Sequence, residues 1–211
     1  MDRTAYWYFD FVSPFAYLQL QAMPALRERL EITPRPVLLG AILGHHGQLG
    51  PAEIPGKREF TYRFAQWRAD RDGIPLRFPP AHPFNPLAAL RLCIAAGSGW
   101  DAVGALFDHL WREGRSGTTA GELAEVGRAL GIADVAAAIA ADEVKAALRA
   151  NTEEALAAGV YGVPTVRVGA ELFWGSDATP MLHAFLDDPA LFRSPDYRRL
   201  AQLPEAASRP R

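Results

Sequence analysis

The chain has 211 residues, 49% of them hydrophobic, which is enough to bury the core of one domain or of one domain with a large insertion. Its formal net charge of -2 provides no field for nucleic acid, and no apolar run is long enough to span a bilayer, so we expect neither as a partner. The single cysteine, Cys93, excludes an internal disulfide and a CxxC redox pair, and the lack of an apolar signal segment predicts a cytoplasmic protein.

The chain begins with a β-α-β pattern. Residues 6–9 are aromatic and favour a strand, and apolar residues at helical spacing follow from residue 16 to residue 30. Ser13 lies at the changeover as a candidate helix N-cap, with a proline at the first helical position, where no N–H is needed. Pro24 is expected to kink this helix. Residues 32–39 are expected to form a second strand, because their prolines suit a sheet edge. The connection from the first strand is long enough for the two to run parallel.

From Gly40 the pattern changes to a loop rich in glycine and proline, followed by helices and by no convincing strand until Val166. Phe60, Phe64 and Trp67 share one face of the first helix, and we expect this stripe to be core rather than a cofactor site. All-helical sequence of this length exceeds a simple crossover and predicts a helical subdomain inserted between strands. The predicted helices cover residues 59–71, 85–96, 100–113, 123–130 and 142–158.

The end of the chain returns to β structure. Strands are predicted over residues 166–168 and 172–174, joined by a tight turn, and a closing helix follows over residues 178–186 with Ser176 or Asp177 as its cap. The predicted order is therefore β-α-β, a helical insertion, then α-β-β-α. We divide the chain into a discontinuous α/β domain, an inserted helical domain and a tail, which cover residues 1–45 with 142–200, 46–141 and 201–211 respectively.

This order resembles the thioredoxin-like fold, with a large all-helical insertion between its βαβ and ββα halves. The loop Gly162-Val163-Pro164-Thr165 resembles the cis-proline loop of thioredoxin-like proteins, and Ser13 stands where disulfide oxidoreductases carry a reactive cysteine. The resemblance to the 2-hydroxychromene-2-carboxylate isomerases and the related kappa-class glutathione transferases is close, and it runs from about residue 6 to residue 186. It is completed by Lys57, Asn85-Pro86-Leu87 and Phe173-Trp174-Gly175-Ser176-Asp177.

The resemblance implies glutathione as the cofactor. The backbone of Val163, exposed before a cis Pro164, would pair with the backbone of glutathione as an added strand does. The hydroxyl of Ser13 would stabilise the glutathione thiolate near a helix start. Ser176 and Asp177 would hold the charged γ-glutamyl end.

The resemblance also implies a reaction and a substrate. The reaction would be cis-trans isomerisation of 2-hydroxychromene-2-carboxylate or a related aromatic-degradation intermediate, through reversible addition of the thiolate. Lys57 is the candidate cation for a substrate carboxylate, and Asn85 is a polar group that would orient it. A kappa-type glutathione transferase or peroxidase is the close alternative, and a non-catalytic thioredoxin-like binding module is an alternative of another class. Kappa-type proteins form dimers, so the resemblance implies a homodimer.

Several of these residues have a structural alternative. Ser13 and Asn85 are both explained as helix caps, and Lys57 as an ordinary exposed lysine. Asp10 is explained as a turn former, although it could also tune the site. The pair His45-His46 lies in a glycine-rich loop with no third ligand at metal-site spacing, so we expect no metal. Relatives often carry an arginine where this chain has Ala178, which leaves the contacts to the end of glutathione open.

Overall fold

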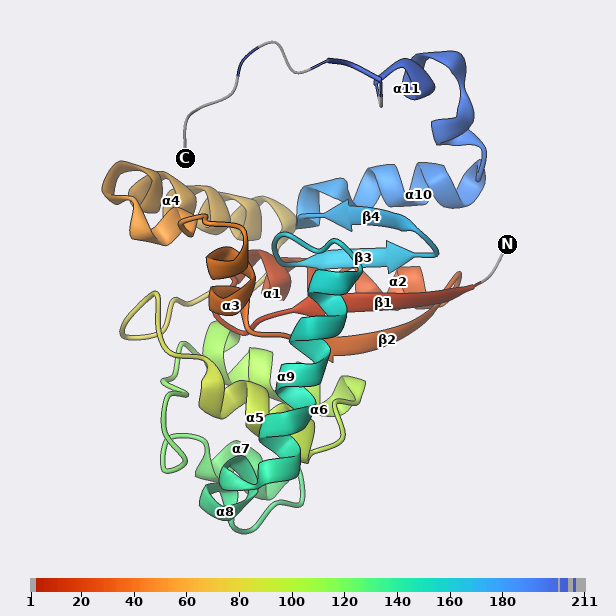
Figure 1. The fold of residues 1–211 in the computed structure, drawn as a ribbon. Coiled ribbons are helices and arrows are strands. Elements are labelled where there is room, and N and C mark those ends of the chain that lie inside the picture. The colour runs from red at the N-terminus through yellow and green to blue at the C-terminus, as the bar shows by residue number, and fades with distance from the viewer. Residues whose placement is uncertain (1–2, 201, 205–206, 208–211) are drawn as a thin grey trace.

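The computed structural model describes residues 3–200, 202–204 and 207 (Figure 1). Four strands form one mixed sheet in the order β2-β1-β3-β4. β1 (Thr4–Phe9) runs parallel to β2 (Glu31–Pro36) and antiparallel to β3 (Thr165–Val168), which pairs antiparallel with β4 (Glu171–Trp174). The predicted β-α-β start, the hairpin near the end and the edge position of the proline-containing strand are confirmed.

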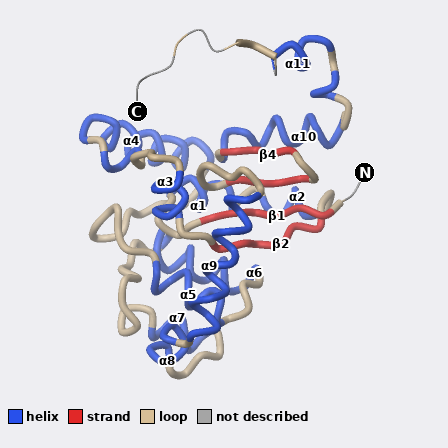
Figure 2. Tube along the Cα trace, in the orientation of Figure 1, coloured by secondary structure: helices blue, strands red, loops and turns tan. Residues whose placement is uncertain are grey.

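Helices cover both faces of this sheet (Figure 2). α1 (Pro14–Leu20), α2 (Met23–Arg27) and α10 (Thr179–Asp187) pack on the face to which β1 turns Trp7 and Phe9, and they share the larger core. α3 (Leu39–His45) and α9 (Asp142–Ala157) pack on the other face, where Tyr8 of β1 lies in a smaller cluster. The alternation of side chains along β1 therefore fills both layers.

The segment between β2 and β3 is helical, as predicted. α4 (Pro55–Asp72) contacts α1, whereas four helices gather beyond the β2 edge of the sheet (Figure 1). These four are α5 (Leu87–Ala95), α6 (Trp100–Phe107), α7 (Ala124–Ala129) and α8 (Val135–Ala140). The remaining helical elements are a π-helical turn at Asp108–Arg112, α11 (Pro195–Leu200), and short 3-10 turns at Pro51–Glu53, Ser176–Ala178 and Leu191–Arg193.

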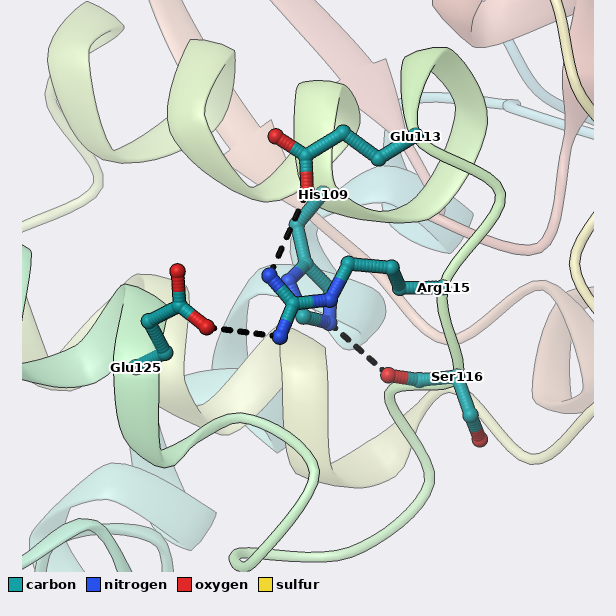
Figure 3. A network of polar contacts seen from close by, with 5 residues as sticks. All are labelled: His109, Glu113, Arg115, Ser116 and Glu125. Atoms are coloured by element: carbon teal, nitrogen blue, oxygen red, sulfur yellow. Dashed lines mark hydrogen bonds and ion pairs between the residues drawn. The ribbon is translucent and has the colours of Figure 1, made fainter.

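A polar network joins the π-helical turn to α7 (Figure 3). The Arg115 guanidinium lies between two carboxylates, 3.3 Å from Glu113 and 2.7 Å from Glu125. Below it, the ring Nε2 of the buried His109 lies 2.8 Å from the carbonyl oxygen of Ser116. Because the two ion pairs are solvent-exposed, their contribution is small, and the network chiefly fixes the path of the loop.

Several local sequence signals have the predicted outcome. Ahead of α7, the Thr119 N–H donates to Glu122 Oε2 at 3.0 Å and the Glu122 N–H donates to Thr119 Oγ1 at 3.3 Å, which is a capping box. Gly131 and Gly159, placed just beyond α7 and α9, have φ values of +81° and +82°. These left-handed conformations favour glycine and end both helices where the sequence predicts.

Other elements differ from the prediction. The long helix expected over residues 16–30 is split into α1 and α2, and Pro24 lies in the first turn of the second piece, where its missing N–H is tolerated. The loop expected after Gly40 contains the helix α3, and α8 and α11 were not predicted. Most of the predicted tail, residues 201, 205–206 and 208–211, lies outside the described residues.

The aromatic stripe on α4 is not core. Phe60 is 67% exposed and Trp67 is 53% exposed, so the core interpretation is wrong for both. The reason is that α4 buries the small side chains of Ala65 and Ala69 and leaves its large rings outside. The rings form a stack along the helix surface instead, with Phe64 5.9 Å between centroids from each of the other two.

Candidate active site

Ser13 caps α1, as the sequence predicts. Its backbone is extended, with φ -92° and ψ 114°, and its Oγ accepts a hydrogen bond from the Ala16 N–H at 3.3 Å. The side chain is buried but lines a cavity described below. Its hydroxyl hydrogen has no acceptor among the described residues, so the cap leaves one donor free to act on a bound group.

The turn that carries Ser13 is held through its backbone by residues from distant parts of the chain. The indole Nε1 of Trp111 donates to the carbonyl oxygen of Phe11 at 2.7 Å. The ring Nε2 of His82 lies 2.7 Å from the carbonyl oxygen of Val12, and the Val12 N–H donates to Asp10 Oδ1 at 3.0 Å. Hydrogen bonds therefore fix the backbone directly before Ser13, which holds the Ser13 hydroxyl in a defined position.

Asp10 is fully buried at the end of β1. Its second carboxyl oxygen accepts from the Leu39 N–H at 2.8 Å, so the side chain ties the Ser13 turn to the first residue of α3. Burial raises the pKa of Asp10 to about 7, against the two backbone N–H donors, which lower it. Asp10 is a turn former, as one interpretation of the sequence had it, and also a titratable group at the cavity wall.

His82 belongs to a network that reaches α4. Its Nδ1 lies 2.7 Å from the Tyr62 hydroxyl, and the Arg58 guanidinium donates to its carbonyl oxygen at 2.6 Å. Burial and the nearby Arg58 charge lower the pKa of His82, so the ring is neutral near pH 7. Because a carbonyl only accepts, Nε2 carries the ring proton and donates it to Val12.

Two hollows meet at this turn. The first, here called the inner cavity, has a volume of about 300 Å³ and is lined largely by apolar side chains and backbone. Its polar lining residues are Asp10, Ser13, Glu53, Thr61 and His82, and no lysine or arginine belongs to its described lining. It suits a small apolar molecule held next to the Ser13 hydroxyl.

The second hollow, here called the groove, has a volume of about 380 Å³ and shares Phe15 and Val163 with the inner cavity. Unlike the cavity, it is lined by charged groups of both signs: Lys57 and Arg68 from α4, and Asp177 beyond β4. The two hollows thus adjoin each other but are chemically distinct.

The peptide between Val163 and Pro164 is cis, as the resemblance implies. Neither the N–H nor the C=O of Val163 has a hydrogen-bond partner within the described part of the chain, so both are available to an added strand. The loop is packed tightly from below, since a Cβ on Gly162 would lie 2.6 Å from the indole Nε1 of Trp174. A larger residue at position 162 would therefore require the Trp174 ring to move.

Ser176 and Asp177 both line the groove, and they have a partner that the sequence did not reveal. The Arg68 guanidinium donates to Ser176 Oγ at 2.7 Å. A spacing signal could have identified this arginine, because residues 57, 61, 64 and 68 share one face of a helix and all line one of the two hollows. The aromatic stripe at residues 60, 64 and 67 overlaps this face at Phe64 but includes neither Lys57 nor Arg68.

The two residues expected to contact a substrate are placed apart. Lys57 lines the groove and not the inner cavity, whereas Asn85 lines neither. Asn85 is exposed, and its Oδ1 accepts from the Leu87 N–H at 3.1 Å at the start of α5, as a capping side chain does.

Among the described residues, no group of three or more histidine, cysteine or acidic side chains is arranged to hold a metal ion. His46 instead lies 3.3 Å from the carbonyl oxygen of Val160 through its Nε2. Within the same part of the chain, no helix has the length and apolar character that crossing a membrane requires.

The arrangement of a capped helix start opposite a cis-proline loop agrees with a comparison against known families, in which residues 6–187 match the DSBA-like thioredoxin domain. The chain belongs to this family. The predicted thioredoxin-like fold with helical insertions is therefore confirmed for this DSBA-like chain.

Individual relatives point to a subgroup within the family. Glutathione S-transferase kappa 2 of Caenorhabditis elegans is 26% identical, over 89% of this chain and 92% of its own length. A 2-hydroxychromene-2-carboxylate isomerase of Sphingobium xenophagum is also 26% identical, over 89% of this chain and 100% of its own. A solved structure of a 2-hydroxychromene-2-carboxylate isomerase superposes with a TM-score of 0.74 at 26% identity, covering 96% of this chain and 100% of that one. The resemblance seen in the sequence motifs is confirmed.

Proposed function

We propose that this DSBA-like chain is a glutathione-dependent enzyme that holds the cofactor in the groove and turns over an electrophile in the inner cavity. The observation that carries the proposal is the Ser13 hydroxyl: its hydrogen is uncommitted, and it lines the cavity that shares Val163 with the groove. With Cys93 buried inside α5, the chain has no thiol of its own at this position. The reactive sulfur must then arrive with a bound molecule.

The charged groups and the free backbone groups of the groove match those of glutathione. Glutathione carries two carboxylates and one ammonium, and the groove offers two cations, Lys57 and Arg68, and one carboxylate, Asp177. The free N–H and C=O of Val163 suit its peptide backbone. Relatives often carry an arginine at the position of Ala178. In this chain the guanidinium at the groove comes instead from Arg68 of α4, which donates to Ser176.

Glutathione held at Val163, Lys57, Arg68 and Asp177 would supply a thiolate for reversible addition to a conjugated double bond, where forming the C–S bond would break the π bond and allow rotation until that C–S bond breaks again. Ser13 donates its hydroxyl hydrogen toward the sulfur position and favours the anion over the thiol. The backbone contacts from Trp111 and His82 keep the Ser13 turn fixed during this step. The largely apolar lining of the inner cavity limits contact between water and the carbon that the thiolate attacks.

We infer that the reaction is a cis-trans isomerisation, with a kappa-type transfer of glutathione to an electrophile as the second candidate. Both use the same thiolate site and differ in whether glutathione is released unchanged. The predicted contacts of Lys57 and Asn85 with a substrate carboxylate are not part of this proposal, because one side chain lines the groove and the other lines neither hollow. Mass spectrometry of the products separates the two reactions, since only transfer gives a stable glutathione conjugate.

Binding of glutathione is the first test. Trp174 lines the groove, so its fluorescence should change saturably as glutathione is added. We expect binding at millimolar concentration or below, and weaker binding of cysteinylglycine, which lacks the γ-glutamyl group. The absence of a saturable response up to millimolar glutathione would exclude both enzyme proposals. Saturable binding without turnover of any conjugated electrophile would favour the non-catalytic binding module.

A further inference from the structure

The charged side chains of the two hollows are divided unequally. Every lysine and arginine among the described lining residues belongs to the groove, whereas the inner cavity is lined by two carboxyl groups, those of Asp10 and Glu53. The electrophile proposed above would occupy the inner cavity, next to Ser13. The sign of the charge on that wall therefore bears on which electrophile the cavity accepts.

Neither carboxyl group is neutralised by a cation. Asp10 is held by two backbone N–H groups, and Glu53 accepts from the backbone N–H of Gly50. No ion pair of either residue is present in the described ranges. Each carboxyl group is therefore hydrogen-bonded to the backbone and not to a cation.

His82, the remaining titratable group on this wall, does not supply a positive charge. Its Nε2 is used on the Val12 carbonyl and its Nδ1 faces the Tyr62 hydroxyl, so neither nitrogen is free for a ligand. The Arg58 guanidinium beside it is itself directed at the His82 carbonyl oxygen and at the Tyr62 hydroxyl. A carboxylate inside the cavity would find no cationic partner.

Lys57 is a candidate cation from outside the cavity. It lies one helical turn before Thr61, whose hydroxyl donates to the Lys57 carbonyl oxygen at 2.7 Å, but its side chain lines the groove. There it faces the position of the glutathione carboxylates, so a carboxylate in the cavity would have to compete with the cofactor for it.

We propose that the inner cavity takes an uncharged conjugated electrophile, such as an α,β-unsaturated ketone, and disfavours one that carries a carboxylate. The inference rests on the proposed function for the identity of the reaction, and on the cavity wall for the charge. Burying an unpaired carboxylate against a wall that offers Glu53 and no cation is costly, whereas an apolar ketone loses little on entering. Both the substrate predicted by the resemblance and its ring-opened form carry a carboxylate, so this chain is expected to differ from those isomerases in substrate class.

A matched pair of probes tests the charge directly. Benzylideneacetone and benzylidenepyruvate share the phenyl ring and the conjugated double bond, and differ in a methyl group against a carboxylate. Equilibrium dialysis without glutathione should show binding of the ketone about tenfold tighter than the carboxylate, or more. Equal or tighter binding of the carboxylate, or no measurable binding of the ketone, would overturn the inference.

A charge substitution with a matched control sharpens the test. Thr61→Lys places an ammonium group on the cavity wall and should strengthen binding of benzylidenepyruvate about tenfold while leaving the ketone within about threefold. Gln66→Lys makes the same charge change on α4 at a residue that lines neither hollow, and should alter neither probe. An equal gain in both variants would show a long-range charge effect and contradict a cavity site.

The two proposals fail separately. If glutathione binds and forms a thiolate but the carboxylate probe binds as well as the ketone, the enzyme proposal stands and the charge inference is wrong. If the ketone is preferred but glutathione does not bind, the cavity has the inferred charge class and the glutathione proposal is wrong.

Discussion

The ring Nε2 of His82 lies 2.7 Å from the carbonyl oxygen of Val12, the residue directly before Ser13. Through Tyr62 and Arg58, the same histidine is connected to α4, the helix that also carries Lys57 and Arg68 into the groove. One side chain thus joins the helix that lines the groove to the turn that carries Ser13, the proposed hydrogen-bond donor to a thiolate. His82 acts here as a positioning residue and not as a proton carrier, because both of its ring nitrogens are engaged.

His82→Leu should lower turnover more than it weakens glutathione binding. The substitution leaves the Val12 carbonyl without its donor, at a cost of about 1–3 kcal/mol, and frees the peptide before Ser13. We expect kcat at saturating glutathione to fall about tenfold with a small change in the glutathione Kd. His82→Gln, which keeps an N–H donor near the Nε2 position, should recover most of the loss. An identical kcat in the leucine variant and the wild type would exclude the positioning role.

Arg68→Ala should weaken glutathione binding. The lost guanidinium contact is charge-assisted and worth about 1.5–3 kcal/mol, which corresponds to about tenfold to a hundredfold in Kd. The matched control is Arg63→Ala, which removes an exposed arginine of the same helix that pairs with Glu59. Fluorescence titration of both variants measures the effect, and raising the salt concentration should narrow the difference between them. Comparable losses in the two variants would remove Arg68 from the groove contacts.

Many of the helix starts and helix ends could be predicted from the sequence because their signals are local. Ser13 followed by proline favours a helix start without help from distant residues. The capping box at Thr119 and Glu122 likewise lies within four residues. Gly159 ends α9 through its own left-handed backbone. The cis state of Pro164 came from the resemblance rather than from any local rule, and it is confirmed.

The parts that could not be predicted depend on distant partners. α3 contains two glycines and has no side-chain cap of its own, but the N–H groups of Leu38 and Leu39 donate to Thr152 and Asp10, far away in the sequence. Likewise, the contact of Arg68 with Ser176 spans 108 positions. Periodicity on α4 identified an apolar face but could not show that this face is turned to solvent.

The free energy of unfolding should depend on pH through the ionisation of Asp10. Its pKa is raised from 3.8 to about 7 by burial, so between these values the folded state binds a proton that the unfolded state releases. Stability from this group is therefore full below about pH 4 and is lost as the pH rises toward 7, by up to about 4 kcal/mol.

The comparison of wild type with Asp10→Asn isolates this effect from that of His82, whose contribution to stability changes with pH in the opposite sense. Its pKa is lowered by burial, so its contribution grows as the pH rises. In chemical denaturation, the stability of wild type relative to the variant should fall between pH 4 and pH 7. A constant difference across that range would contradict a buried, titrating Asp10.

Cys93 should be inert in the folded protein. It is fully buried in α5, and burial raises the pKa of its thiol to about 12, so almost no thiolate is present at neutral pH. Ellman's reagent should react with it only after denaturant is added. Rapid reaction in the native state would mean that a second thiol competes with glutathione in any assay of the site.

The central claim is that the Ser13 hydroxyl stabilises the thiolate of bound glutathione. It is tested most directly by a pH titration of the thiolate ultraviolet absorption of the glutathione complex, in wild type, Ser13→Ala and Ser13→Thr. Because Cys93 does not ionise in this range, the signal reports the bound cofactor. Alanine also removes the cap on Ala16, at a cost of about 1 kcal/mol, so the titration is run well below the unfolding temperature. We expect the pKa of the bound thiol to lie below that of free glutathione in wild type and in the threonine variant, and to rise by about one unit or more in the alanine variant. The same thiol pKa in wild type and Ser13→Ala, with glutathione bound to both, would contradict the claim.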